Sequence, residues 1–343
     1  MRDAFSQIER GQKFLDADRE HATSRDVSGV QVPGLVVVGI HDFLRQELPP
    51  REEILSPWLL TQSLNMIHSW RGVGKTHVAL GIAYAVAAGG SFLTWKAEKA
   101  RRVLYIDGEM PATSLQKRLA AINLVATAEP AEGMLNLLTP DLQTGPMPDL
   151  ATVSGQAAVN AVLGQTELIV LDNLSCLARS GGKENEAESW RPVAEWALEM
   201  RTRGRSVVFI HHSAKTGQQR GTSKREDLLD AVLRLKEPSD YRHGEGARFE
   251  VHYEKARDLH GTGNRPIAAQ LIEDAQGRHV WDVRLAEETT FDRVVALAND
   301  GLSRADVAQE LDCNRSTVYR HWREAEGQGL IQHSESRRKR GLR

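Results

Sequence analysis

The sequence predicts an α/β fold with a mostly parallel sheet, followed by a small all-α module. Three observations lead to this prediction. Short runs rich in Val, Ile and Leu alternate with longer helical stretches between about residues 64 and 285. A glycine-rich loop joins the first of these runs to a helix. From residue 289 onward, three short amphipathic patterns replace the apolar runs.

Length and composition narrow the class of protein. A chain of 343 residues predicts one large domain with a satellite, or two domains. Its formal net charge of -2 excludes a uniformly basic coat for nucleic acid, so any such contact must come from local patches. Cys176 and Cys313 lie too far apart in sequence to indicate a metal site or a disulfide framework. The polar N-terminus, and apolar runs shorter than the roughly 20 residues of a membrane span, predict a cytoplasmic protein with no membrane contact.

Changes in pattern suggest the domain boundaries. Residues 1–40 are predicted to form a flexible or partner-docked arm, although residues 34–63 are expected to pack on the main domain as a lead-in. Residues 41–286 form the predicted α/β core and residues 289–333 the helical module. A basic tail, 334–343, ends the chain.

Four apolar runs form the predicted parallel strands: LNMIHS, VLYIDGE, LIVLDN and VVFIHH. Continuous apolar strands of this kind are buried on both faces of a sheet. Further on, RFEVHYEKAR and AAQLIED…HVWDV alternate apolar and polar residues. Alternation predicts antiparallel strands that complete the sheet.

The stretch SWRGVGKT, residues 69–76, matches the phosphate-binding pattern G-x-x-x-x-G-K-[ST] except at its first position. Ser69 replaces the first glycine, which serves the entry turn, so serine is tolerated if its backbone can adopt the required angles. Glycines let backbone N–H groups surround phosphates, and the following helix N-terminus adds a partial positive charge. The alternative is a plain glycine turn before a helix. The predicted ATP-binding residues are Ser69, Gly72, Val73, Gly74, Lys75, Thr76 and His77.

Two strands end in carboxylates suited to this chemistry. Asp172 ends LIVLDN and, with the Thr76 hydroxyl, is the predicted Mg²⁺ ligand. Glu109, in VLYIDGEMP, is predicted to orient or deprotonate water, with Asp107 as the weaker candidate. Both acids could instead cap the helix near Pro111, and a kinase for small molecules could bind its substrate with an acid at this position.

The strand VVFIHH ends in His211 and His212. Neighbouring strand residues point to opposite faces, so the pair is poorly placed to hold one metal ion. His212 is the predicted sensor of the γ-phosphate, and a buried, hydrogen-bonded histidine is the plain interpretation for one of the two.

Together, these motifs resemble the RecA/DnaB-type ATPase core. The stretches IDGEMP, LDNLS, HHSAKTGQQRGTSKREDLLD and FEVHYEKAR further resemble RepA-like plasmid replicative helicases and related AAA-type ATPases of mobile elements. The resemblance covers roughly residues 40 to 285. The chain departs from the family at Ser69 and in its C-terminal extension.

The resemblance implies a ring, usually a hexamer, with Mg²⁺ and ATP between subunits. It assigns Glu109 as the hydrolytic base, Asp172 to Mg²⁺ and His212 as the sensor, where relatives often carry Gln. Lys255 and Arg257 resemble a pair that reaches the neighbour's site and neutralises charge on the γ-phosphate. A solvated edge-strand face is the alternative for these two residues.

In such a ring, the loops after the Asp172 and His212 strands face the central channel, where single-stranded DNA would pass. They lack aromatic residues, so stacking on bases is not the evident mode, and plain solvated loops would carry similar charges. The candidate DNA contacts are Arg179, Lys183, Lys215, Arg220, Lys224 and Arg225.

The stretch SRADVAQELDCNRSTVYRHWREAEGQGLI fits a helix-turn-helix that resembles those of resolvases and winged-helix regulators. Ser303 is expected to cap its first helix, and Val318 and Trp322 to face inward from the second. A module for oligomer or partner contacts is the alternative to duplex DNA. The outward residues, predicted to contact DNA, are Arg315, Ser316, Thr317, Tyr319 and Arg320.

These observations predict an ATP-hydrolysing, DNA-associated motor, foremost a ring-forming replicative helicase of a plasmid or mobile element. An ATP-switched DNA-binding regulator without unwinding activity is the second hypothesis. A small-molecule kinase is the third, and it lacks an evident arginine-rich lid.

Overall fold

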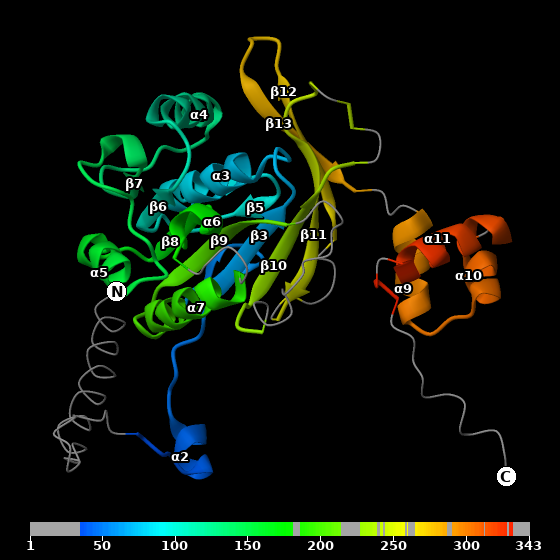
Figure 1. Cartoon of the computed structure of the whole chain (residues 1–343), viewed down its shortest axis with the longest axis horizontal. Coiled ribbons are helices and arrows are strands. Elements are labelled where there is room, and N and C mark those ends of the chain that lie inside the picture. Colours follow the sequence, from blue (N-terminus) through cyan, green and yellow to red (C-terminus); the bar gives the residue numbers. More distant parts are fainter. Residues whose placement is uncertain are drawn as a thin grey trace. The chain divides into compact units, whose positions relative to one another are not determined.

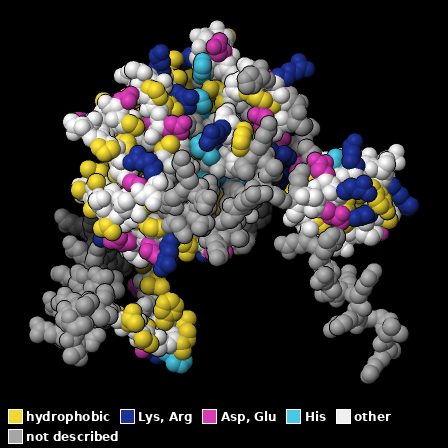
Figure 2. Space-filling view, in the orientation of Figure 1, with side chains coloured by type: hydrophobic (Ala, Val, Ile, Leu, Met, Phe, Trp, Pro, Cys, Tyr) yellow, Lys and Arg dark blue, Asp and Glu magenta, His cyan; other side chains and the backbone are white. Residues whose placement is uncertain are grey.

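The computed structural model describes residues 35–180, 186–213 (backbone alone for 186–189), 227–238, 241–242, 244–257, 259, 265–286, 290–311, 313–327 and 329–331. The chain divides into two compact units, residues 1–50 and 51–343. In the first, α2 (Ile40–Arg45) has no buried residue, and its apolar side chains lie on the surface (Figure 2). In the larger unit, the later part of the expected lead-in is packed from Ile54 onward.

The larger unit contains a nine-stranded sheet in the order β13-β12-β11-β10-β3-β9-β8-β6-β7 (Figure 1). Six strands are parallel: β3 (Leu64–Ser69), β6 (Val103–Asp107), β7 (Leu135–Leu138), β8 (Leu168–Asp172), β9 (Ser206–His212) and β10 (Ala231–Lys236). Antiparallel pairing adds β11 (Arg248–Ala256), β12 (Ile267–Glu273) and β13 (His279–Leu285). The predicted fold class, an α/β core with a mostly parallel sheet, is confirmed.

Helices cover both faces of the parallel strands (Figure 1). One face carries α3 (Lys75–Ala88) and α4 (Ala112–Val125). The other carries α5 (Val153–Val162), α6 (Leu174–Leu177) and α7 (Glu186–Thr202). Small elements complete the unit: β1 (Glu53–Leu55), β2 (Leu59–Leu60), β4 (Ser91–Phe92), β5 (Trp95–Lys96) and the 3₁₀ turn η1 (Pro140–Leu142). No helix in the described part of the chain is long and apolar enough to cross a membrane.

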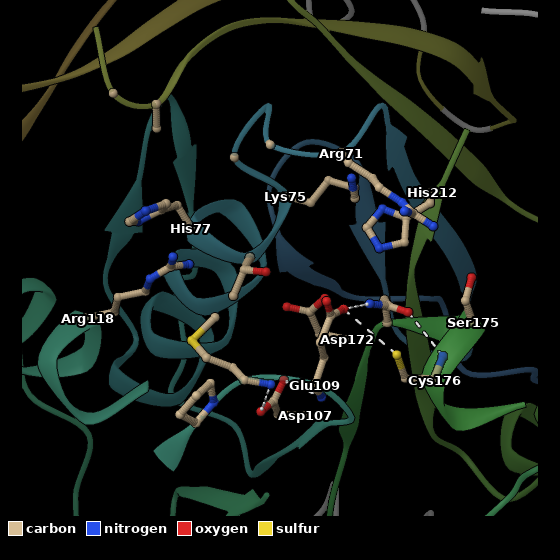
Figure 3. Close-up of a pocket in the computed structure, with 18 of the residues that line it drawn as sticks. Arg71, Lys75, His77, Asp107, Glu109, Arg118, Asp172, Ser175, Cys176 and His212 are labelled. Atoms are coloured by element: carbon tan, nitrogen blue, oxygen red, sulfur yellow. Dashed lines mark hydrogen bonds between the residues drawn. The ribbon is translucent and has the colours of Figure 1, made fainter. Parts of the chain in front are cut away.

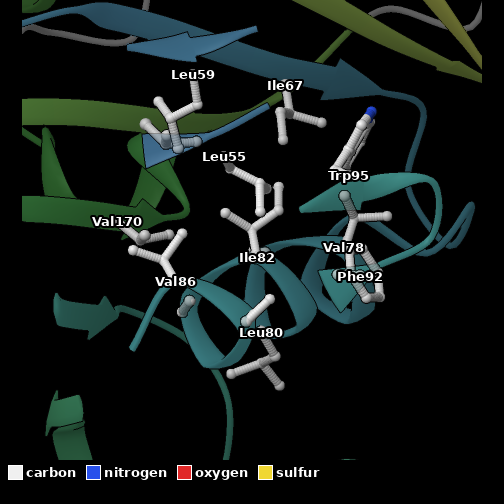
Figure 4. Close-up of a cluster of buried hydrophobic side chains, with 14 of the residues drawn as sticks. Leu55, Leu59, Ile67, Val78, Leu80, Ile82, Val86, Phe92, Trp95 and Val170 are labelled. Carbon is white, nitrogen blue, oxygen red and sulfur yellow. The ribbon is translucent and has the colours of Figure 1, made fainter. Parts of the chain in front are cut away.

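The six parallel strands contribute alternate side chains to two separate cores. Ile67 and Val170 pack with α3 and the β1–β2 hairpin on one face (Figure 4). Their neighbours Met66 and Leu171 point to the other face, into the core that includes Phe209. Successive strand residues point to opposite faces, so a sheet covered on both sides requires continuous apolar runs. This burial explains why the runs carried no alternating pattern.

The helical module consists of α9 (Thr290–Asn299), α10 (Arg304–Glu310) and α11 (Arg315–Gly327). Ser303 caps α10 as predicted: its hydroxyl accepts from the Asp306 N–H, and the Asp306 carboxylate accepts from the Ser303 N–H. Val318 and Trp322, the two residues of α11 predicted to face inward, are buried. The module's core is Val294, Ala298, Val307, Ala308, Val318, Trp322, Ala325 and Ile331.

Candidate nucleotide site

A pocket of about 930 Å³ lies where the carboxyl ends of β3, β6, β8 and β9 meet (Figure 3). Parallel strands end at one edge of a sheet, and ligands of open α/β folds bind beside that edge. The connection between β10 and β11, which the sequence did not point to, supplies a further wall. That wall contains Tyr241, Gly244, Gly246 and Ala247.

The phosphate loop has the backbone that its glycines predict. Gly72 and Gly74 have φ values of 85° and 122°, a region that side chains disfavour. Ser69, by contrast, is the last residue of β3 and has extended backbone, so its position does not require glycine. Its hydroxyl oxygen also accepts from the Lys75 ammonium at 3.2 Å, a contact that glycine could not make.

Lys75 is 5% exposed and donates to the Ser69 and Trp70 carbonyl oxygens at 3.1 and 2.9 Å. Burial lowers the pKa of Lys75 to about 8, against the opposing attraction of Asp172 and Glu109. The ammonium is therefore mostly charged at neutral pH, inside a pocket edged by backbone N–H groups. A phosphate group suits this position because it supplies the missing negative charge.

Two other predicted contacts of the loop differ in orientation. Val73 is 4% exposed and its side chain belongs to the hydrophobic core, so any contact with a nucleotide would come from its backbone. His77 lines the pocket, and Figure 3 shows it beside Arg118. Burial, reinforced by the Arg118 charge, lowers the pKa of His77 to about 4, so its ring is neutral near pH 7.

Asp172 ends β8 and is 4% exposed. The Tyr105 hydroxyl donates to its Oδ2 at 2.6 Å. Burial raises the pKa of Asp172, against the opposing effect of the Tyr105 and Thr76 hydroxyls. No group of three or more His, Cys, Asp or Glu side chains within the described residues could hold a metal alone. One hydroxyl and one carboxylate fit Mg²⁺, which usually keeps waters and binds substrate phosphates.

The two acids after β6 have different environments. Asp107 is buried and accepts from the backbone N–H groups of Glu109 and Met110 at 3.4 and 3.0 Å. Burial raises the pKa of Asp107 to about 6. Asp107 thus holds the turn between β6 and α4, but it does not cap α4, whose N-cap Pro111 has no side-chain cap. Glu109 is exposed to the pocket, and its Oε2 accepts from Asn173 Nδ2 at 2.6 Å.

The histidine pair is split by the strand, as alternation requires. His211 is 5% exposed, whereas His212 lines the pocket. Burial, together with the nearby Lys75 charge, lowers the pKa of His212 and favours its neutral ring. Figure 3 shows Arg71, from the phosphate loop, beside His212. Arg71 and Lys75 therefore form a basic end of the pocket, opposite its carboxylates. Arg71 was not among the residues predicted from the sequence.

A model of the AAA domain family matches residues 32–218, which is more than half of the chain. The chain belongs to this family. The matched segment contains the phosphate loop, Glu109, Asp172 and His212. A second model, of the helix-turn-helix domain of resolvase, matches residues 284–325. The protein is thus a P-loop ATPase of the AAA domain family joined to a helix-turn-helix, and the match does not single out the RepA-like helicases.

Solved structures similar to this AAA domain protein include two from archaea. One is a KaiC-like protein from Pyrococcus horikoshii OT3, with 13% identity and a TM-score of 0.45 over 66% of this chain and 91% of that one. Another is the flagellar accessory protein FlaH from Methanocaldococcus jannaschii, with 13% identity and a TM-score of 0.46 over the same shares.

Lys255 and Arg257 lie beyond the matched AAA domain, at the end of β11. Lys255 pairs in register with Val232 of β10, and the Arg257 guanidinium donates to the Asp227 carbonyl oxygen. Neither residue lines the pocket of its own chain. A role in a neighbouring subunit stays a prediction.

The predicted channel residues of the AAA domain are only partly described. Arg179 is exposed, but its guanidinium donates to the Met147 carbonyl oxygen at 2.6 Å. That bond holds Arg179 against its own chain. The other candidates, Lys183, Lys215, Arg220, Lys224 and Arg225, lie outside the described residues.

Most of the candidate DNA contacts of the helical module are exposed. Basic side chains gather on the surface of this module (Figure 2). Tyr319 is 50% exposed, with the Arg304 guanidinium 5.3 Å from its ring centre. Arg304 also lies 5.2 Å from the Trp322 ring, so it links α10 to α11. The remaining candidates are Arg315, Ser316 and Arg320, which are exposed, and Thr317, which is half-buried.

Proposed function

We propose that this protein is an Mg²⁺-dependent ATPase that acts on DNA, as a ring-forming replicative helicase of a plasmid or other mobile element. One observation carries the proposal: the pocket unites Lys75, Asp172 and Glu109 in a chain that also has a resolvase-type helix-turn-helix. The first feature supports hydrolysis and the second supports DNA as the partner.

Each pocket residue has a role in this proposal. Lys75 and the loop N–H groups bind the β- and γ-phosphates of ATP, while Thr76 and Asp172 hold Mg²⁺. The metal neutralises charge on the phosphates when bound. Glu109 accepts a proton from the attacking water, since it is the carboxylate that is exposed to the pocket. His212, close to Lys75, reports the γ-phosphate to the segment that follows β9.

The ring is inferred from the resemblance to hexameric ATPases. In it, Lys255 and Arg257 would complete a neighbour's site, and both lie outside their own pocket. β8 and β9 are adjacent in the sheet, so the segments that follow them leave from the same edge as the pocket. This placement supports contact of both segments with single-stranded DNA during hydrolysis. A cytoplasmic location belongs to the same proposal.

The helix-turn-helix favours a second candidate. A resolvase-type module binds duplex DNA, and a helicase does not require one. An ATPase that switches its assembly at a DNA site, without unwinding, would use the same pocket and the same module. The two candidates differ in what hydrolysis accomplishes.

An activity assay separates the candidates. ATP hydrolysis is measured with and without single-stranded DNA, together with unwinding of a forked duplex, with Lys75→Ala as the inactive control. Stimulation by single strands and ATP-dependent unwinding would support the helicase. Tight, sequence-specific duplex binding without unwinding would support the regulator. Absence of hydrolysis under all conditions would contradict both.

Complementation tests the ring. Arg257→Ala and Lys75→Ala should each be inactive and folded, because one lacks the residue given to the neighbour and the other lacks its own phosphate contact. A mixture of the two variants forms some interfaces with an intact loop and an intact Arg257, so activity should partly return. Normal hydrolysis by Arg257→Ala alone would exclude its role in the neighbouring site.

A further inference from the structure

Asn173, which directly follows the predicted Mg²⁺ ligand, is held at both ends of its amide. It is 3% exposed and forms the N-cap of α6, where its side-chain oxygen accepts from the Cys176 backbone N–H at 3.1 Å. A backbone N–H can only donate, so the atom facing it must be Oδ1. The amide nitrogen therefore points the other way, where it donates to Glu109 Oε2 at 2.6 Å (Figure 3).

Cys176 contacts the same carboxylate oxygen. Its Sγ lies 3.8 Å from Glu109 Oε2, and burial raises the pKa of the thiol. The thiol therefore keeps its proton and acts as a weak donor. Among the described residues, no hydrogen bond to the other oxygen, Oε1, is observed. Oε2 is thus occupied by donors from α6, and Oε1 is available in the pocket.

We propose that Asn173 is a positioning residue for hydrolysis: it fixes the Glu109 carboxylate so that Oε1 is the atom that accepts the proton of water. The inference rests on the proposed role of Glu109. In the step, a water O–H bond breaks and its proton moves to Oε1. The water oxygen bonds to the γ-phosphorus, and the bond from phosphorus to the ADP oxygen breaks, with its electron pair leaving on ADP.

The physical reason for such a residue lies in the exposure of Glu109. An exposed glutamate samples several rotamers, and a base is effective only when its oxygen is aligned with the water that it deprotonates. A hydrogen bond from a buried, doubly anchored amide selects one arrangement before the substrate arrives. Asn173 is itself immobilised because α6 would lose its cap if the amide turned.

Two substitutions separate positioning from helix capping. Asn173→Ser and Asn173→Asp both keep a side-chain oxygen that can cap α6, but neither places a donor on Glu109. For Asn173→Ser we expect kcat to fall on the order of 10- to 100-fold, with the KM for ATP and nucleotide binding within about twofold of wild type. Asn173→Asp should lose more, because its charge repels Glu109. Asn136→Ser, an exposed change on β7, is the matched control and should leave kcat unchanged.

The test includes Glu109 itself. Asn173→Ser should have no further effect on the residual rate of Glu109→Gln, because a positioning residue acts only through its partner. Wild-type kcat in Asn173→Ser would overturn the proposal, as would a lowered melting temperature or raised KM with kcat unchanged. If Glu109→Gln keeps its turnover, the assigned role of Glu109 is wrong. If Glu109→Gln loses its turnover but Asn173→Ser keeps a wild-type kcat, only the positioning role of Asn173 is wrong.

Discussion

The ATPase core and the helical module obtain their candidate sites in different ways. In the core, Lys75, Glu109, Asp172 and His212 come from four segments that only the parallel sheet brings together. In the module, the Ser303 cap, the small core and the outward face all come from residues 290–331. Chemistry in the core therefore depends on long-range packing, whereas the surface of the module depends on three short helices.

Burial follows the same division. Lys75, Asp172 and Asn173 are at most 5% exposed, so each depends on specific partners inside the protein. The candidate DNA contacts Arg315 and Arg320 are exposed. A change to one region should consequently leave the other function intact, and the following substitutions examine that separation.

The largest expected effect is that of Glu109→Gln. Removing the proton acceptor should lower kcat by roughly a thousandfold, while ATP binding and duplex DNA binding persist. Steady-state hydrolysis, equilibrium nucleotide binding and duplex binding are measured on one preparation. Retained turnover would remove Glu109 from its assigned role, and lost duplex binding would show that the two regions are not separable.

Trp322→Ala should damage the module alone. The side chain is 8% exposed, donates to Glu326 at 2.9 Å and packs on Arg304. Its loss should cost about 3–5 kcal/mol, enough to unfold so small a core. We expect duplex binding to disappear and hydrolysis without DNA to stay near wild type, as measured by binding and ATPase assays. A parallel loss of basal hydrolysis would contradict the separation.

Arg315→Ala combined with Arg320→Ala should produce a smaller effect at the surface. If both side chains contact phosphate, duplex affinity should fall about tenfold or more, and the slope of log affinity against log salt should decrease by about 2. Arg293→Ala, an exposed change on α9, serves as the control. Unchanged affinity and slope would favour a partner-binding role for the module.

The smallest expected effect concerns pH and Asp107. Burial raises the pKa of Asp107 from 3.8 to about 6, so the folded core binds this proton more tightly than the unfolded chain does. The stability contribution is full below about pH 4 and is lost as pH rises through about 6, amounting to about 1–3 kcal/mol. Asp107→Asn should flatten this part of the curve in urea unfolding between pH 4 and 7. An unchanged curve would show that Asp107 does not titrate in this range.

Local sequence patterns predicted most strands but not their order. β3, β6, β8 and β9 were visible as apolar runs, and β11 to β13 as alternating ones. β10 was not recognised, although it lies between β3 and β11. Strand order depends on contacts between residues far apart in sequence, which no local periodicity records.

The same limit applies to the site. Lys75 was predicted from a spaced motif whose chemistry requires that spacing, and Asp172 from its position at the end of a buried apolar strand. Asn173 was missed because its partner, Glu109, comes from another strand and becomes adjacent only through the sheet. The one available signal was an asparagine at the junction of a buried strand and a helix, which indicates a cap rather than a contact with a catalytic acid.

The connection between β10 and β11 has a consequence for dividing the protein into parts. The AAA family match ends at residue 218, yet Ala247 and Phe249 lie beyond it and pack against the phosphate loop, 3.4 and 3.2 Å from where a Cβ on Gly74 would be. A fragment cut at that boundary would lack this wall, and β3 would lose its partner β10. Such a fragment would expose a long apolar strand edge and be prone to aggregate. The shortest fragment that keeps the ATPase core intact must therefore extend beyond residue 218, at least to the end of β11.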